Sequence, residues 1–138
     1  HLIMAKTCTI GDEIVEAFNK FKTAKTKETS AMILKINVKE LKVEIQETFD
    51  DNADYEDIQD ELPSSVPRYI IVSQKHVRDD GRITYPLLFI YYVPTAIKPE
   101  LAMLYSSTKH ELGVKISVNK TFEVRDADQL TEEWVLKK

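Results

Sequence analysis

The sequence predicts a single α/β (α+β) domain whose sheet is covered by helices on both faces. Helix-like and strand-like segments alternate along the 138 residues, and neighbouring strands come mostly as hairpins rather than as βαβ units. The run Leu87–Val93 is apolar or aromatic at every position, which is typical of an inner strand buried on both faces. No internal repeat or long linker divides the chain.

Composition narrows the class of protein. The 43% hydrophobic and 30% charged residues are ordinary for a soluble globular domain. The longest apolar run is far shorter than the roughly 20 residues of a membrane span, and Leu2–Met4 is too short for a signal peptide. The single cysteine, Cys8, excludes an internal disulfide and favours a reducing compartment. The net charge of −4 argues against nucleic-acid binding.

The first helix is predicted to begin near Asp12. Thr9 and Asp12 have the spacing of a capping box, and acidic residues suit a helix N-terminus. An apolar stripe at spacings of three and four predicts the buried face, formed by Ile14, Phe18 and Phe21. Four lysines follow along the helix end and the next loop: Lys20, Lys22, Lys25 and Lys27. They form either a solvated basic turn or a basic contact patch.

A strand hairpin and a second helix come next. Met32–Ile36 is a short apolar run, and Leu41–Ile45 alternates between apolar and polar residues, which predicts a half-buried strand. The acidic segment Asp50–Leu62 carries apolar residues at helical spacing and stops at Pro63, so it predicts a short amphipathic helix. The segment lacks the glycine and ligand spacing of a calcium loop, which favours a solvated face over a metal site.

Two further strands, Arg68–Val77 and Ile83–Val93, are predicted on either side of a tight Asp-Gly turn. Pro86 interrupts the second strand and predicts an edge position or a bulge there. At the tip of this hairpin, Arg78 and Arg82 either pair locally or offer a contact surface.

The last third of the chain predicts a long helix, a strand and a final helix. Pro99 suits the first helical turn, and an apolar stripe follows: Leu101, Leu104, Tyr105, Thr108 and Leu112. Beyond Gly113 the pattern fits either a continued helix or a strand over 114–118. Thr121–Val124 has the pattern of a strand. The final helix has two candidate caps, Asp128 and Thr131.

Catalytic constellations are scarce. Only three glycines occur, too few for a phosphate-binding loop, which excludes a P-loop enzyme. His76 and His110 have no cysteine or histidine nearby at metal-ligand spacing. A paired-carboxylate enzyme stays open at this point, because acids distant in sequence can converge in space. We expect no catalytic residue, no metal and no cofactor.

Seven short motifs occur in a fixed order between Cys8 and the C-terminus. They are Asp60-Glu61-Leu62-Pro63, Pro67-Arg68-Tyr69, Asp79-Asp80-Gly81-Arg82, Tyr85-Pro86-Leu87, Lys98-Pro99-Glu100, Met103-Leu104-Tyr105 and Leu130-Thr131-Glu132-Glu133-Trp134. In this order and spacing, the chain resembles the glia maturation factors, which share the actin-depolymerising-factor homology family with cofilin. We expect residues 8–138 to form that domain. Residues 1–7 are then a flexible N-terminus with non-native residues before Met4, and the family continues slightly beyond Lys138.

The resemblance implies a central, mixed, mostly antiparallel sheet of about five strands. It favours a helix from Pro99 past Gly113 to about Ser117, followed by a strand near Thr121–Arg125. It also implies a non-enzymatic, cytoplasmic regulator of branched actin. Such a protein binds the actin-related protein 2/3 complex, inhibits its nucleation activity and promotes filament debranching. For so small an acidic domain we expect a monomer.

Two residues bear on the choice of partner. Cofilin-like proteins carry basic residues just before the Met-x-Tyr segment of the long helix, where they pair with actin. Here Glu100 and Ala102 occupy that stretch. Losing close charge pairs at an interface costs about 2–5 kcal/mol when one partner stays buried. We therefore expect weak or no direct actin binding, and the alternative is cofilin-like binding and severing.

The resemblance implies two binding surfaces. The first combines the N-terminal segment with the long helix and includes Lys98, Glu100, Met103, Leu104, Ser106 and Lys109. Met103 is either a contact on this surface or core filler, because it lies beside the apolar stripe. The second surface includes the hairpin tip and the start of the last helix, namely Arg78, Arg82, Glu132 and Glu133. Lys20, Lys22 and Lys25 align with a basic cluster of the family.

Overall fold

The computed structural model describes residues 8–25, 27–118 and 120–138. The predictions for the N-terminal residues 1–7 lie outside these ranges. Five strands form the central sheet in the order β2 (Lys42–Phe49), β1 (Ser30–Asn37), β3 (Arg68–Ser73), β6 (Leu87–Tyr92) and β7 (Thr121–Val124). All neighbouring strands are antiparallel except β6 and β7, which run parallel. The expected mixed, mostly antiparallel sheet is confirmed.

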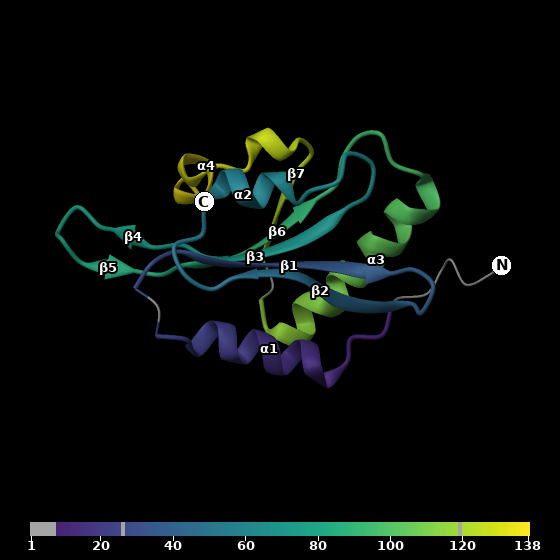
Figure 1. The fold of residues 1–138 in the computed structure, drawn as a ribbon, viewed down its shortest axis with the longest axis horizontal. Coiled ribbons are helices and arrows are strands. Elements are labelled where there is room, and N and C mark those ends of the chain that lie inside the picture. The colour runs from purple at the N-terminus through teal and green to yellow at the C-terminus, as the bar shows by residue number, and fades with distance from the viewer. Residues whose placement is uncertain (1–7, 26, 119) are drawn as a thin grey trace.

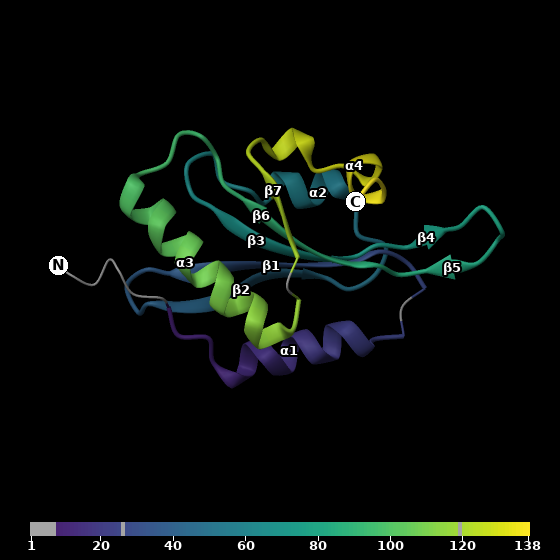
Figure 2. The same ribbon diagram turned by 180° about the vertical axis from the view of Figure 1, so that it is seen from behind.

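Helices cover both faces of the sheet (Figures 1 and 2). The long helices α1 (Asp12–Thr23) and α3 (Pro99–Ile116) lie on one face. The short helices α2 (Tyr55–Asp60) and α4 (Glu132–Leu136) lie on the other. Each face buries its own apolar cluster, because neighbouring residues of a strand point to opposite sides. None of the described helices is both long and apolar enough to cross a bilayer.

The start of α1 differs from the predicted capping box. Gly11 is the N-cap, and no side chain caps the helix. Thr9 instead forms an isolated bridge beside β2, where its N–H donates to the Leu41 carbonyl at 2.8 Å and its carbonyl accepts from Val43 at 3.0 Å. The capping prediction was wrong because pairing with β2 holds this segment away from the helix end. The predicted acidic first turn and buried stripe of α1 are confirmed.

The β1–β2 hairpin contains a bulge. Ile33 faces Glu47 while Leu34 faces Ile45, so Gln46 has no partner residue opposite it. The bulge reverses the alternation of β2, which places Phe49 on the opposite face from Val43. The predicted alternation lies before the bulge, where Val43 is buried as expected but Ile45 is 38% exposed.

The second hairpin is broken into separate pieces. The predicted strands 68–77 and 83–93 each divide, because the main sheet ends at Ser73 and resumes at Leu87. Between them, β4 (His76–Val77) and β5 (Ile83–Thr84) form a small two-stranded sheet that projects from the domain (Figure 1). Pro86 lies at the break, where its carbonyl accepts from Gln74 at 3.0 Å. The predicted interruption at this proline is confirmed.

Helix α3 continues past Gly113, as the resemblance implied, so a strand over 114–118 is wrong. A Cβ atom at Gly113 would lie 2.8 Å from the Val118 carbonyl oxygen, so only glycine allows the chain to return this closely. The helix ends at Ile116, and its C-cap residue Ser117 has a left-handed φ of 60°. Of the two candidate caps for the last helix, Thr131 is the N-cap of α4 and accepts from the Trp134 N–H.

Two shorter elements complete the second face. Helix α2 covers only the middle of the predicted segment Asp50–Leu62; Asp54 caps it and Ile58 is its buried residue. A 3₁₀ helix, Ala127–Gln129, precedes α4 and has a capping box formed by Asp126 and Gln129.

Candidate functional site

The outward face of α3 carries most of the first predicted surface. Lys98, Glu100 and Ser106 are exposed, and the Met103 side chain is 58% exposed. Met103 is therefore not core filler. Its exposed thioether side chain is available for contact with a partner.

Two members of this predicted surface are less accessible. Leu104 is only 7% exposed and belongs to the core beneath α3, so it supports the surface from within. The Lys109 ammonium lies 5.0 Å from the centre of the Tyr91 ring, a cation–π distance. The N-terminal part of this surface lies outside the described residues.

Buried polar contacts fix the orientation of α3. The Tyr105 hydroxyl accepts from the Ile36 N–H at 2.9 Å, and the Tyr69 hydroxyl donates to the Tyr105 carbonyl at 2.6 Å. The Thr108 hydroxyl accepts from the Cys8 N–H at 3.0 Å. These bonds tie the helix to the sheet and to the N-terminal segment, so the exposed face is held in one direction.

A hollow of about 480 Å³ lies beside the first turn of α3. Its apolar lining comes from Leu101 and Leu104 of the helix and from Val38 and Leu41 of the β1–β2 turn. Sequence reasoning missed the contribution of this turn. The available signal was Val38, an apolar residue in a turn, whose side chain is 52% exposed.

The second predicted surface joins the projecting hairpin to α4. Arg78 donates to the Thr84 hydroxyl at 3.0 Å, and Arg82 pairs with Asp80 at 2.8 Å. Both arginines thus make local contacts, yet both remain exposed. The hydrogen bonds from Arg82 lower the pKa of Asp80 below its ordinary value, so this carboxylate stays charged.

The start of α4 lies at the base of the same hairpin. Glu132 lines a hollow of about 390 Å³ together with Val77 of β4. Glu133 is exposed and lies 3.8 Å from Lys137. The structure therefore brings the acidic turn and the hairpin to one end of the molecule (Figure 1).

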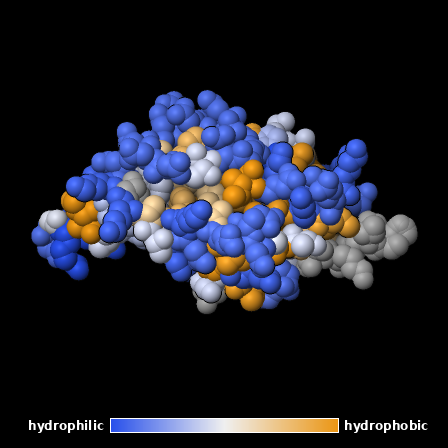
Figure 3. Space-filling view, turned by 60° about the horizontal axis from the view of Figure 1, so that its bottom comes forward, coloured by the Kyte–Doolittle hydropathy of each residue, from blue (hydrophilic) through white to orange (hydrophobic). Residues whose placement is uncertain are grey.

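The basic segment lies at the end of α1. Lys20, Lys22 and Lys25 are all exposed, and the Lys22 ammonium lies 5.6 Å from the centre of the Phe18 ring. Viewed from the α1 side, the molecule shows hydrophobic residues as separate patches in a largely hydrophilic surface (Figure 3). One of these patches lies on the β4–β5 hairpin, where Val77 and Ile83 are 60% and 50% exposed.

Groups suited to metal binding do not gather in the described parts of the chain. No three histidine, cysteine or acidic residues lie together there as potential metal ligands. Cys8 is buried, and burial raises the pKa of its thiol, which keeps it in the less reactive neutral form.

Comparison with known proteins decides the family. Residues 7–138 match the model of the cofilin/tropomyosin-type actin-binding proteins. The chain belongs to this family. It is 39% identical to the glia maturation factor of Drosophila melanogaster over 93% of its own length and 92% of that protein. It is 37% identical to the human glia maturation factor beta over 95% and 92% of the two chains.

Solved structures agree with this assignment. The glia maturation factor of Caenorhabditis elegans superimposes with a TM-score of 0.80 at 34% identity, over 96% of each chain. A cofilin from Streptomyces griseoflavus also reaches a TM-score of 0.80, but at 21% identity it shows the fold alone. The resemblance to glia maturation factors and the fold that it implied are both confirmed.

Proposed function

We propose that this protein is a non-enzymatic regulator of branched actin networks. It binds the actin-related protein 2/3 complex, inhibits nucleation by that complex and promotes dissociation of daughter filaments at branches. It acts as a monomer in the cytoplasm, at branched-actin sites, and needs no cofactor. Membership of an actin-binding family and the similarity to glia maturation factors support this proposal.

The observation that carries the choice of partner is the first turn of α3. Glu100 is exposed beside the exposed Met103, and Ala102 adds no charge. An actin-binding helix of the cofilin type needs basic residues here. An acidic residue in their place loses the charge pairs with actin and disfavours that partner. An actin-related subunit with a similar groove and a different surface charge is therefore the partner we propose for α3.

Debranching follows if binding discriminates between two states of the branch. A ligand with equal affinity for both states shifts nothing, however tightly it binds. The protein must therefore bind more tightly to the state of the complex that holds the daughter filament poorly. The second surface, at the opposite end of the sheet from the first turn of α3 (Figure 1), gives the domain a further contact near the branch.

A paired binding assay tests the proposal. The purified protein is titrated against the labelled actin-related protein 2/3 complex and, in parallel, sedimented with bare actin filaments at physiological salt. We expect saturable binding to the complex and little co-sedimentation. Tight filament binding with no binding to the complex would refute the proposal and favour the cofilin-like alternative, which the family description itself motivates.

A further inference from the structure

Gln74 is a buried polar residue at the point where the sheet gives way to the projecting hairpin. It follows directly after β3, and its side chain is 0% exposed. Its amide oxygen accepts from the Tyr55 hydroxyl at 2.6 Å. Its amide nitrogen donates to the Glu132 carboxylate at 3.0 Å and to the Lys75 carbonyl at 2.8 Å. One side chain thereby joins α2, α4 and the base of the hairpin.

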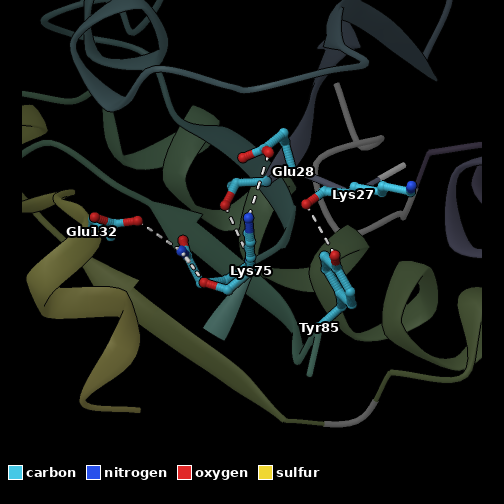
Figure 4. A network of polar contacts seen from close by, with 7 residues as sticks. Lys27, Glu28, Lys75, Tyr85 and Glu132 are labelled. Carbon is cyan, nitrogen blue, oxygen red and sulfur yellow. Dashed lines mark hydrogen bonds and ion pairs between the residues drawn. The ribbon is translucent and has the colours of Figure 1, made fainter. Parts of the chain in front are cut away.

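The base of the hairpin is also tied to the segment that follows α1 (Figure 4). The Tyr85 hydroxyl donates to the Lys27 carbonyl at 3.0 Å, and the Lys75 ammonium lies 3.4 Å from the Glu28 carboxylate. The Lys75 N–H donates to the Thr29 hydroxyl at 3.0 Å. The segment that follows α1 at residues 27–29, the base of the hairpin and α4 are therefore joined in one polar cluster.

Such a cluster specifies geometry more than it adds stability. A buried amide without partners is costly, whereas a satisfied network fixes the direction of every group in it. Helix α4 has only five residues, too few to be stable alone, so its orientation depends on its contacts. The bond from Gln74 to Glu132 acts on the first turn of α4, which is the acidic part of the second surface.

We infer that Gln74 is a positioning residue, which holds the first turn of α4 against the base of the β4–β5 hairpin. Through this contact the exposed Glu133 and the hairpin arginines are presented to a partner as one rigid surface. The inference rests on the proposed function for its binding consequence. Its structural part stands on the geometry of the free protein alone.

Amide hydrogen exchange of the free protein tests the positioning. Gln74→Met keeps the volume and removes the hydrogen bonds; Glu132→Ala removes the same contact from the exposed side, in case the buried change prevents folding. We expect both variants to accelerate exchange of the α4 amides about tenfold, the typical effect of losing a hydrogen bond to a charged group. The Arg78 amide in the hairpin, bonded to the Arg82 carbonyl, should change less than twofold.

Tyr85→Phe is the matched control. It removes one hydrogen bond from the same cluster, at 3.0 Å to Lys27, without touching α4. We expect exchange of the α4 amides to stay within twofold of the unmodified protein. Unchanged α4 exchange in Gln74→Met, or an equal acceleration of all amides in that variant, would overturn the positioning role.

Binding to the actin-related protein 2/3 complex provides the second readout. We expect Gln74→Met to weaken binding to the complex about tenfold. Glu133→Gln alone should also weaken binding. When Glu133→Gln is added to Gln74→Met, we expect a further loss of less than twofold. Fully additive effects would overturn the binding part of the inference. If the unmodified protein does not bind the complex, the proposed function fails, while the exchange experiment still decides the role of Gln74.

Discussion

Neighbouring residues on α3 allow binding and stability to be separated. Met103 is 58% exposed, whereas Leu104 is 7% exposed within the core. Met103→Ala should change the free energy of unfolding by less than about 0.5 kcal/mol, as exposed positions do. Leu104→Ala should reduce it by about 2–4 kcal/mol, because it leaves a cavity beneath the helix.

The expected numbers follow from the size of the domain. With an unfolding entropy of about 2.1 cal/mol/K per residue, each kcal/mol shifts Tm by about 3.5 °C, so Leu104→Ala should lower Tm by about 7–14 °C. Met103→Ala should leave Tm within about 2 °C of the unmodified protein. It should raise Kd for the actin-related protein 2/3 complex about tenfold, the effect of removing a central interface side chain.

Thermal unfolding followed by circular dichroism measures Tm, and titration of the labelled complex measures Kd, on the same protein samples. Val114→Ala truncates another exposed apolar side chain of the same helix, 63% exposed and outside the predicted surface, and serves as the control for truncation alone. An unchanged Kd for Met103→Ala would refute docking through this face of α3. A large loss of Tm in Met103→Ala would refute the assignment of its side chain to the surface.

Three further predictions concern the helix end, the core and the choice of partner. Gly113→Ala should lower the free energy of unfolding by about 1–3 kcal/mol despite alanine's helix preference, because the new methyl meets the Val118 carbonyl at 2.8 Å; an unchanged urea midpoint would contradict this. Burial raises the pKa of Tyr91 from 10.0 to about 12. The folded state thus binds this proton more tightly than the unfolded state, so stability present below pH 10 should be lost as the pH rises towards 12. Melting curves across this range check it, and a flat Tm would count against it. Glu100→Lys combined with Ala102→Arg should increase co-sedimentation with actin filaments at unchanged Tm; no gain would show that these charges do not select the partner.

The fold was predictable where one periodicity dominates a segment. The stripe of Ile14, Phe18 and Phe21 predicted α1, and the run Leu87–Val93 predicted the inner strand β6. Both predictions held because burial of these apolar side chains in the core determines the local structure. Local patterns failed to predict the structure where a contact with a residue distant in the sequence determines it. Thr9 fits a helix cap, but pairing with β2 uses its backbone. Gln74 has no signal in the sequence, because two of its partners, Tyr55 and Glu132, are distant from it along the chain.

The candidate surfaces were predictable only through the family resemblance. Helical spacing placed Met103 beside the apolar stripe and left its role open, and only the packed structure shows its exposure. The same spacing could not show that Leu104 is buried under the surface it was assigned to. Val38 was missed because no local rule relates a turn between β1 and β2 to the first turn of a helix some sixty positions later in the printed sequence.

The parallel pairing of β6 with β7 has a consequence for the thermodynamics of recognition. Because these strands point the same way, the chain must cross over between them, and α3 is that crossover. Both ends of the helix are therefore attached to strands that are bonded to each other. A helix held in this way loses little conformational entropy when it docks. The free energy gained from contacts along α3 is thus available for affinity instead of being spent on ordering the helix.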